Sequence, residues 1–382
     1  MRIGIDARFY GTTGKGLGRY TQKLIHELEN IDTENEYIVF LSAENIDAYR
    51  PVSGRFRKVL CRARWYSFAE QFWLPFFLAS FRLDLMHFPH FNVPLLYRRP
   101  FLFTLHDLIL FHFPTRRAST RSRIFYRMKF LGYRLVLRSA LQRARKVIAV
   151  SHFTESDILT NFPQIAPKLS VTYEAAESFC HFASKQKALE VLEEFGLAEQ
   201  EVGRAILQPY ILYVGNAYPH KNLELVLSLA LNFPQEHFVL VGKEDYFYAR
   251  LKREASARGL GNILFIGALS DQELGIFYRF ARIYFFPSLY EGFGLPPLEA
   301  MNYGLPVLSS NAASLPEILG EAAHYFDPTD PSDAKAKLSR LLQDEEERFK
   351  ARRSGFEHSG RFSWRRMAEE TLALYRSIPK SR

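Results

Sequence analysis

Short apolar runs of strand length recur along this chain, separated each time by longer segments with helical patterning, and the series occurs twice. In the first half the runs lie at residues 2–5, 37–41, 85–88, 101–104 and 146–150. After a polar, glutamate-rich stretch at 185–204 they resume at 211–214, 238–241, 263–266, 283–286 and 306–309. Strands that alternate with helices predict a parallel sheet covered on both faces. We therefore expect an α/β chain with two doubly wound, Rossmann-like domains in series.

The length of 382 residues allows two domains, each with a core of its own. We expect an N-terminal domain over residues 1–190 and a C-terminal domain over 200–362. The segment 363–382 has its apolar residues spaced for one helix face, and it could stay with the second domain or cross back to the first; we expect it to pack on the first. Ligands bind at the carboxyl ends of the strands in such sheets, so two facing domains would enclose a cleft.

Two local patterns predict helix starts in the second half. Ser270 with Glu273, and Ser314 with Glu317, have the spacing of capping boxes.

Composition narrows the class of protein. The chain is 47% hydrophobic and 24% charged, as in globular proteins, and no run approaches the roughly 20 apolar residues of a membrane span. The nearest run, 68–81, is short and contains Glu70 and Pro75. Met1 leads directly into a strand pattern and not into a signal peptide. Cys61 and Cys180 offer neither a disulfide framework nor a zinc knuckle. We expect a cytoplasmic protein.

The net charge of +9 is unevenly distributed. No acidic residue lies between Asp107 and Glu155, whereas eleven basic residues lie at 116–146. If this segment is helical, five arginines fall within one arc of roughly 60°. These are Arg123, Arg127, Arg134, Arg138 and Arg145, with Ile124, Met128, Leu131 and Leu135 beside them. The face is either a solvated side of a packed helix or a docking face for anionic lipid or a lipid-linked pyrophosphate acceptor. No nucleic-acid module is recognisable, so we do not expect nucleic acid as a partner.

The sequence fits poorly to two classes of nucleotide-binding protein, the dinucleotide-binding enzymes and the P-loop proteins. Gly16 and Gly18 precede a helix expected from about Arg19, which suggests a dinucleotide site, but the next strand ends Phe40-Leu41-Ser42 without the acidic residue that binds ribose. Residues 11–16 do not match a P-loop either. No Asp-x-Asp occurs anywhere, so we expect no metal: protein cations and backbone amides would carry the charge of a diphosphate.

The segment 288–301 reads Ser-Leu-Tyr-Glu-Gly-Phe-Gly-Leu-Pro-Pro-Leu-Glu-Ala-Met. It resembles the Glu-x7-Glu signature of the family 4 retaining glycosyltransferases. Pro296 suits the start of a helix, whose first turn would hold Glu299. The resemblance implies that Glu299 accepts hydrogen bonds from the donor ribose. It also implies that the transferred sugar is held by Glu291 and by the amides of Gly292, Phe293, Gly294 and Leu295. The alternative is that both glutamates form a solvated helix face.

A second segment, 213–223, reads Tyr-Val-Gly-Asn-Ala-Tyr-Pro-His-Lys-Asn-Leu and is similar to the first strand, loop and helix of the family's nucleotide domain. The resemblance implies that Lys221 contacts the donor diphosphate. Asn216, which the resemblance also places at the donor, stands where many relatives have Arg and brings no charge. A solvated loop lysine is the alternative for Lys221.

In the first half, Gly16-Leu17-Gly18-Arg19-Tyr20 resembles the family's N-terminal glycine loop, which implies contact of Gly16 and Gly18 with the diphosphate. The run Phe103-Thr104-Leu105-His106-Asp107 resembles its strand-end histidine motif. In relatives such a histidine contacts the donor sugar near the reacting carbon. The alternative is a core histidine followed by Asp107 as a helix cap.

The resemblance extends over nearly the whole chain and implies the GT-B fold, with an acceptor-binding first domain and a nucleotide-sugar-binding second domain. It names His106, Glu291 and Lys221 as catalytic candidates, without an assigned covalent nucleophile. Bacterial mannosyltransferases of surface-polysaccharide (O-antigen type) assembly are the most similar relatives. The implied reaction is metal-independent, retaining transfer of mannose from GDP-mannose to a lipid-linked or polysaccharide acceptor. It would take place in the cytoplasm, with peripheral contact to the membrane and without a cofactor. A UDP-sugar donor and a non-catalytic sugar-nucleotide or polysaccharide scaffold stay open as alternatives, and the sequence leaves the linkage and the oligomeric state undetermined.

Overall fold

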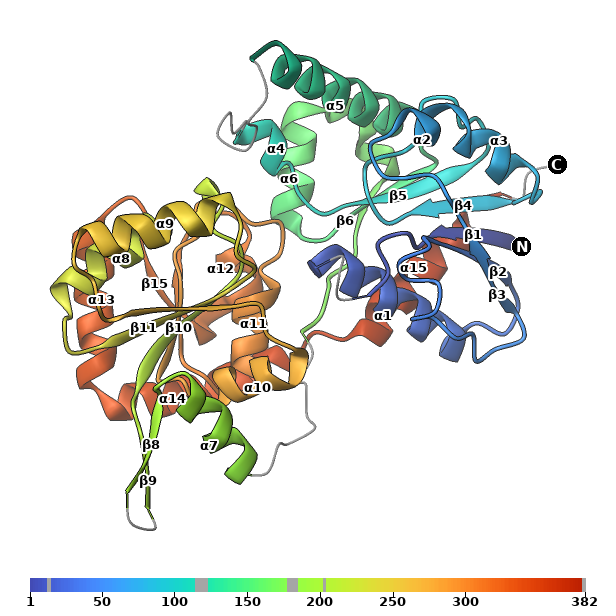
Figure 1. The fold of residues 1–382 in the computed structure, drawn as a ribbon. Helices are drawn as coiled ribbons and strands as arrows, with labels where there is room; N and C mark the ends of the chain where they lie inside the picture. Colours follow the sequence, from blue (N-terminus) through green and yellow to red (C-terminus); the bar gives the residue numbers. More distant parts are fainter. Residues whose placement is uncertain (12–14, 114–122, 177–184, 202–203, 380–382) are drawn as a thin grey trace. The chain divides into compact units, whose positions relative to one another are not determined.

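The computed structural model describes residues 1–11, 15–113, 123–176, 185–201 and 204–379 (Figure 1). The chain forms two compact units, of which the first comprises Met1–Glu174 and Phe362–Arg382 and the second Ala175–Arg361. The division therefore falls earlier than residues 190–200. The stretch before residue 200 packs with the second unit, where the rings of Phe195 and Phe277 lie 5.6 Å apart.

The first unit is built on a seven-stranded sheet with the order β3-β2-β1-β4-β5-β6-β7, and all of its strand pairs are parallel. The strands are β1 (Arg2–Asp6), β2 (Glu36–Leu41), β3 (Phe56–Leu60), β4 (Leu85–Phe88), β5 (Phe101–Leu105), β6 (Lys146–Ala149) and β7 (Leu169–Val171). Five of them coincide with the predicted runs. The sequence did not reveal the two edge strands, because β3 carries charged residues and β7 has only three residues.

Helices cover both faces of this sheet. On one face lie α1 (Lys15–Ile31) and α15 (Trp364–Ser377), which pack on each other. On the other lie α2 (Phe68–Phe72), α3 (Leu74–Ala79), α5 (Arg123–Arg143) and α6 (His152–Asn161), followed by a 3₁₀ turn at Pro163–Lys168. The short helix α4 (Ile109–His112) follows β5. Figure 1 shows α2, α3 and α5 in one layer, and Leu78 of α3 and Leu137 of α5 are buried in the same core cluster as Phe88 and Phe103 of the sheet.

The second unit has a six-stranded parallel sheet with the order β12-β11-β10-β13-β14-β15. Its strands are β10 (Tyr210–Val214), β11 (His237–Val241), β12 (Ile263–Gly267), β13 (Ile283–Phe286), β14 (Val307–Ser310) and β15 (His324–Phe326). Its helices are α8 (Glu224–Asn232), α9 (Tyr246–Ala257), α10 (Asp271–Phe280), α11 (Leu295–Asn302), α12 (Leu315–Leu319), α13 (Pro331–Gln343) and α14 (Glu345–Ser359), with 3₁₀ turns at Pro219–Lys221 and Gly320–Ala322. The polar stretch before it contains α7 (Lys185–Glu194) and a hairpin of β8 (Ala198–Glu201) and β9 (Arg204–Leu207).

One of the two predicted capping boxes is confirmed. Ser270 accepts a hydrogen bond from the amide of Glu273, and the Glu273 side chain accepts one from the amide of Ser270. At Ser314 and Glu317 the predicted helix start is confirmed, since α12 begins at Leu315, but the predicted capping box is wrong. Ser314 has helical backbone angles and makes no side-chain cap bond, because its hydroxyl is engaged elsewhere, as described below.

Candidate functional site

The strand order of each sheet reverses at one place, between β1 and β4 in the first unit and between β10 and β13 in the second. Ligands of open α/β sheets bind beside such a reversal, at the carboxyl ends of the strands. In the second unit the loop after β10 leads to Lys221 and the loop after β13 leads to Glu291. The amide of Leu289 donates to the carbonyl of His220 over 2.7 Å, which ties the two loops together. The two sequence motifs therefore meet at the expected edge of the sheet.

Lys221 and Glu291 form a buried ion pair. The Lys221 Nζ lies 2.5 Å from Glu291 Oε1, and the hydroxyl of Ser288 donates to the same oxygen over 2.5 Å. Lys221 is 8% exposed and Glu291 is 7% exposed. Neither residue is a solvated surface charge. A charge buried in this way needs a partner, and each of the two residues is the counter-ion of the other.

The loop after Glu291 is fixed by its backbone and by Ser314. Gly294 has φ 103° and precedes the first residue of α11, and a Cβ at this position would lie 2.8 Å from the side chain of Leu315. Only glycine adopts this conformation without strain. The hydroxyl of Ser314 donates to the carbonyls of Glu291, at 3.0 Å, and of Phe293, at 3.1 Å. Ser314 thus holds the loop that the sequence assigned to the donor.

Glu299 lies in the second turn of α11, not in the first, because the helix begins at Leu295. Its side chain is buried at 4% exposure, which excludes a solvated helix face. The hydroxyl of Tyr278 in α10 donates to Glu299 Oε2 over 3.1 Å. Between the two glutamates, Gly292 and Phe293 are also buried.

Asn216 shapes the turn after β10. Its side-chain oxygen accepts a hydrogen bond from the amide of Tyr218 at 3.2 Å, and its backbone carbonyl accepts one from the hydroxyl of Tyr213 at 2.7 Å. A contact of Asn216 with the donor stays a prediction.

In the first unit, His106 follows β5 at the carboxyl edge of the sheet. Its Nδ1 lies 2.7 Å from Glu174 Oε1 and its Nε2 lies 2.9 Å from the carbonyl oxygen of Pro89. An ionised carboxylate and a carbonyl oxygen only accept, so this geometry favours protons on both ring nitrogens, the imidazolium form. Burial works against this charge, but the hydrogen bond and the charge of Glu174 outweigh it and raise the pKa of His106. The N-cap position of α4 is held by Leu108 and not by Asp107, whose carboxylate accepts a hydrogen bond from the amide of Ile109.

The imidazole is packed among groups from three further elements. Tyr20 of α1 presents its ring edge-on to His106, with the centroids 4.8 Å apart, and its hydroxyl lies 3.0 Å from Thr104 Oγ1. The same hydroxyl of Thr104 lies 3.0 Å from His87 Nε2, and His87 Nδ1 lies 2.6 Å from the hydroxyl of Tyr375 in α15. A hydrogen-bonded chain therefore runs beside His106 through α1, β5, β4 and α15.

Sequence reasoning missed Glu174. The available signal was its place three residues beyond β7, since the carboxyl ends of parallel strands share one edge.

Gly16 and Gly18 lie inside α1, which begins at Lys15 and not near Arg19. A Cβ on Gly18 would lie 2.1 Å from the carbonyl oxygen of Gly11 and 2.3 Å from that of Phe9. Gly18 is thus required because the chain after β1 passes directly against the helix. Contact of either glycine with a diphosphate stays a prediction.

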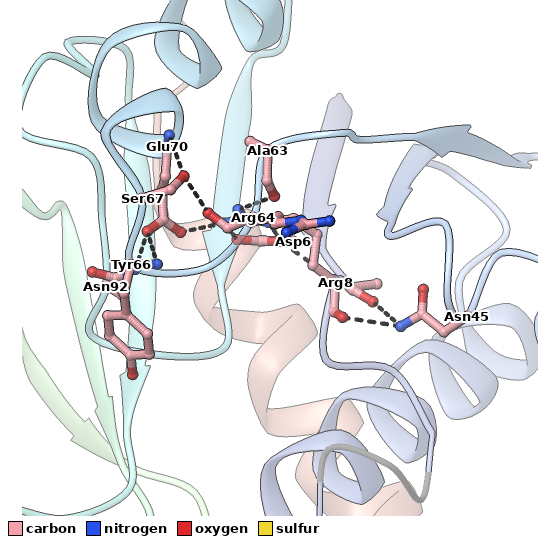
Figure 2. Close-up of polar contacts among 10 residues, drawn as sticks. Asp6, Arg8, Asn45, Ala63, Arg64, Tyr66, Ser67, Glu70 and Asn92 are labelled. Carbon is pink, nitrogen blue, oxygen red and sulfur yellow. Dashed lines mark hydrogen bonds and ion pairs between the residues drawn. The ribbon is translucent and has the colours of Figure 1, made fainter. Parts of the chain in front are cut away.

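The chain after β1 also contains a buried ion triad that the sequence did not reveal (Figure 2). The Arg8 Nη2 lies 2.7 Å from Asp6 Oδ2 and 2.8 Å from Glu70 Oε1, and all three side chains are almost fully buried. Burial tends to lower the pKa of Arg8, but the two carboxylates outweigh it and raise that pKa. The triad fixes α2 to the loop after β1.

Residues 123–143 of the basic segment form α5, and Gly132 does not interrupt the helix. Arg134 and Arg138 are exposed on it, whereas Arg145 lies beyond its end. The side chains of Arg123 and Arg127, and the residues 114–122, lie outside the described part of the structure. Three apolar neighbours on α5 are largely exposed: Met128, Leu131 and Leu135.

Cys61 is buried with a free thiol, and Cys180 lies outside the described residues. Within the described ranges, the structure has no cluster of three or more His, Cys, Asp or Glu side chains suited to a metal ion. The helices there include none with the length and apolar character needed to cross a membrane.

Comparisons with known proteins agree with the family resemblance of the segments 213–223 and 288–301. The family model "Glycosyltransferase Family 4" matches residues 14–175, and "Glycosyl transferases group 1" matches residues 197–358. The two halves of this chain are the family 4 and group 1 domains of a glycosyltransferase.

Individual proteins similar to this enzyme are known from sequence and from structure. It is 29% identical over 387 residues to the O-antigen chain mannosyltransferase B of Escherichia coli, a match covering 95% of this chain and 96% of that one. Its fold is similar to sucrose-phosphate synthase from Thermosynechococcus elongatus, with a TM-score of 0.75, 20% identity and 98% of each chain covered. It is also similar to HepE of Anabaena, solved with UDP and glucose, with a TM-score of 0.72, 16% identity and 99% of each chain covered. The enzyme thus has the GT-B fold, and mannosyltransferases of O-antigen assembly are among its relatives.

Proposed function

We propose that the enzyme transfers mannose from GDP-mannose to a lipid-linked or polysaccharide acceptor, with retention of configuration and without a metal ion. The observation that carries this proposal is the buried Lys221–Glu291 pair at the strand reversal of the second unit. A cation and a carboxylate held there, beside a loop of buried backbone, suit a ligand that combines an anionic diphosphate with a hydroxyl-rich sugar.

The roles divide by chemistry. When the bond between the sugar and the diphosphate breaks, negative charge accumulates on the diphosphate and positive charge on the sugar. Lys221 and the amides of Gly292 to Leu295 offset the negative charge. Glu291 holds the sugar hydroxyls and Glu299 accepts from the ribose. We assign no covalent nucleophile.

His106 is assigned to the donor sugar near the reacting carbon. Because both ring nitrogens are bonded to Glu174 and Pro89, His106 offers the sugar a fixed positive charge and not a free N–H group. A ring that already carries both protons cannot serve as a general base.

The acceptor proposal includes peripheral contact with the cytoplasmic face of a membrane, supported by the exposed Arg134 and Arg138 of α5. Basic side chains near an anionic leaflet each contribute about 1 kcal/mol to binding.

A thermal-shift panel with GDP, UDP, ADP and their mannose and glucose conjugates tests the donor. A ligand that binds only the folded enzyme stabilises it by mass action, so GDP and GDP-mannose should raise the midpoint most. A larger shift with UDP compounds would instead favour the UDP-sugar alternative, for which the HepE complex is a structural precedent. Binding without any donor turnover, even slow hydrolysis, would favour a non-catalytic scaffold.

A further inference from the structure

Four aromatic side chains of α2, α3 and the residue that joins them, which we call the aromatic face, are exposed to solvent. Phe68 is 84% exposed, Phe72 59%, Trp73 44% and Phe76 73%. Single exposed apolar residues are common on protein surfaces, but a cluster of large ones within nine positions marks an interaction site.

The aromatic face is held rigidly. Leu74 and Leu78, on the opposite side of α3, are buried in the core of the first unit. Glu70 anchors α2 from within: it is 0% exposed, pairs with Arg8, and accepts hydrogen bonds from the amide of Tyr66 and the side chain of Asn92 (Figure 2). The inner positions of α2 and α3 are thus occupied by other side chains.

Along the chain segment that carries the aromatic face, the exposed charges have one sign. Between residues 62 and 82 the only carboxylate is Glu70, which is buried and paired, whereas Arg62, Arg64 and Arg82 are exposed. A protein partner with mixed charges has no complement here. Anionic lipid headgroups complement these arginines. Tryptophan and phenylalanine are the side chains that typically enter the headgroup region of a bilayer.

The aromatic face and the exposed side of α5 belong to the same helical layer of the first unit (Figure 1). Leu131 and Leu135 of α5 are 68% and 58% exposed beside the exposed Arg134 and Arg138. The arginines of α5 can attract an anionic surface but cannot enter its apolar part, whereas the aromatic face can.

We propose that the aromatic face of α2 and α3 inserts into the interfacial region of an anionic lipid bilayer and forms the apolar anchor of the enzyme. This inference extends the proposed attachment to the membrane and rests on it, but it is independent of the donor assignment.

The test replaces Phe68, Phe72 and Phe76 together with serine and measures co-sedimentation with phosphatidylcholine vesicles that contain phosphatidylglycerol. Moving one phenylalanine out of water corresponds to roughly a tenfold or larger change in partition, so the variant should bind at least a hundredfold more weakly. A matched control replaces Phe349 and Phe356 of α14, which are 68% and 62% exposed, with serine. The control should bind as the wild type does.

A second measurement uses the unaltered fold. Trp73 fluorescence should shift to the blue on binding and be quenched by brominated lipid, and Trp73→Phe should remove that signal. Absence of quenching in vesicle-bound wild type would place the contact elsewhere and overturn the proposal, even if the serine variant failed to fold.

The salt dependence of vesicle binding distinguishes the charge attraction of the arginines from the insertion of the aromatic face. Glutamine at Arg134 and Arg138 should weaken binding mainly at low ionic strength, because charge attraction is screened within about a Debye length. The serine variant should be weaker at every ionic strength. Equal binding of serine variant and wild type would overturn the proposal. So would a wild type that is a dimer in solution and does not bind vesicles, if the serine variant is a monomer. GDP affinity, measured without vesicles, should be the same in all variants; its absence in the wild type would refute the donor assignment and leave the membrane result intact.

Discussion

The Lys221–Glu291 pair allows a prediction about stability and ligand binding together. Lys221→Met leaves the Glu291 carboxylate buried without a counter-ion, and breaking a buried pair in this way costs about 3 to 5 kcal/mol. Glu291→Gln likewise leaves the Lys221 ammonium buried without a counter-ion, although an amide oxygen that still accepts from Ser288 offsets part of the cost. The double variant Lys221→Met/Glu291→Gln should be more stable than Lys221→Met alone, since no uncompensated charge is left.

The same reasoning predicts the response to a nucleotide. In Glu291→Gln the ammonium of Lys221 has lost its neutralising partner, and a diphosphate placed beside it would restore one. GDP should therefore stabilise Glu291→Gln more than it stabilises the wild type, although transfer activity falls.

The assay is urea denaturation with and without GDP, followed by hydrogen exchange of the β10 and β13 amides. All three tryptophans lie outside the second unit, so their fluorescence does not report on it. As a control, Arg365→Met breaks a pair of similar geometry, 3.0 Å from Glu369, that is exposed on α15. Its cost should stay below about 1 kcal/mol. Equal stability of the single Lys221 variant and the double variant would refute the coupling, and a smaller GDP effect in Glu291→Gln would remove Lys221 from the diphosphate.

Four further outcomes are expected. Glu299→Ala should weaken nucleotide binding by about 1.5 to 3 kcal/mol, because an ionised acceptor for the ribose is lost; unchanged affinity in calorimetry would exclude Glu299 from the site. Transfer should continue in EDTA, and a loss that Mg²⁺ or Mn²⁺ restores would contradict metal independence. The raised pKa of His106 means that its pair with Glu174 stabilises the fold fully below the ordinary histidine value of about 6.5 and less as pH rises through the folded value. The difference in unfolding free energy between wild type and Glu174→Gln should therefore shrink with increasing pH, and a difference constant with pH would mean a neutral ring. Gly18→Ala should lower the melting temperature, because its Cβ meets backbone oxygen, whereas Gly132→Ala in the open middle of α5 should add up to about 1 kcal/mol; shifts of the same sign would contradict this.

The sequence predicted the fold well where burial dominates. Strands such as β5 and β10 are apolar on both faces, so they stand out as short continuous runs. The edge strand β3, with two basic residues, and the three-residue β7 give no such signal. The helix start after Ser314 was predicted correctly, but its capping box was not, because a capping pattern is local, whereas the Ser314 hydroxyl bonds to a loop about twenty residues away.

In the candidate site, too, residues in local motifs were predicted and residues that depend on distant partners were missed. Glu291, Glu299 and Lys221 were identified from motifs that lie on two loops. Their pairing depends on β10 and β13 being neighbours, which strand runs alone do not fix. Glu174 and Arg8 were missed because each acquires its importance from a partner more than fifty residues away.

The return of α15 to the first unit has a consequence for synthesis of the chain. The hydroxyl of Tyr375 bonds to His87, and α15 covers the sheet face on which α1 lies. The second unit is contiguous, from Ala175 to Arg361, and has all its residues before α15 emerges from the ribosome. The unit that starts the chain therefore finishes folding last: until α15 arrives, α1 alone covers that face of the sheet, and the part that α15 will cover stays available to chaperones or to aggregation.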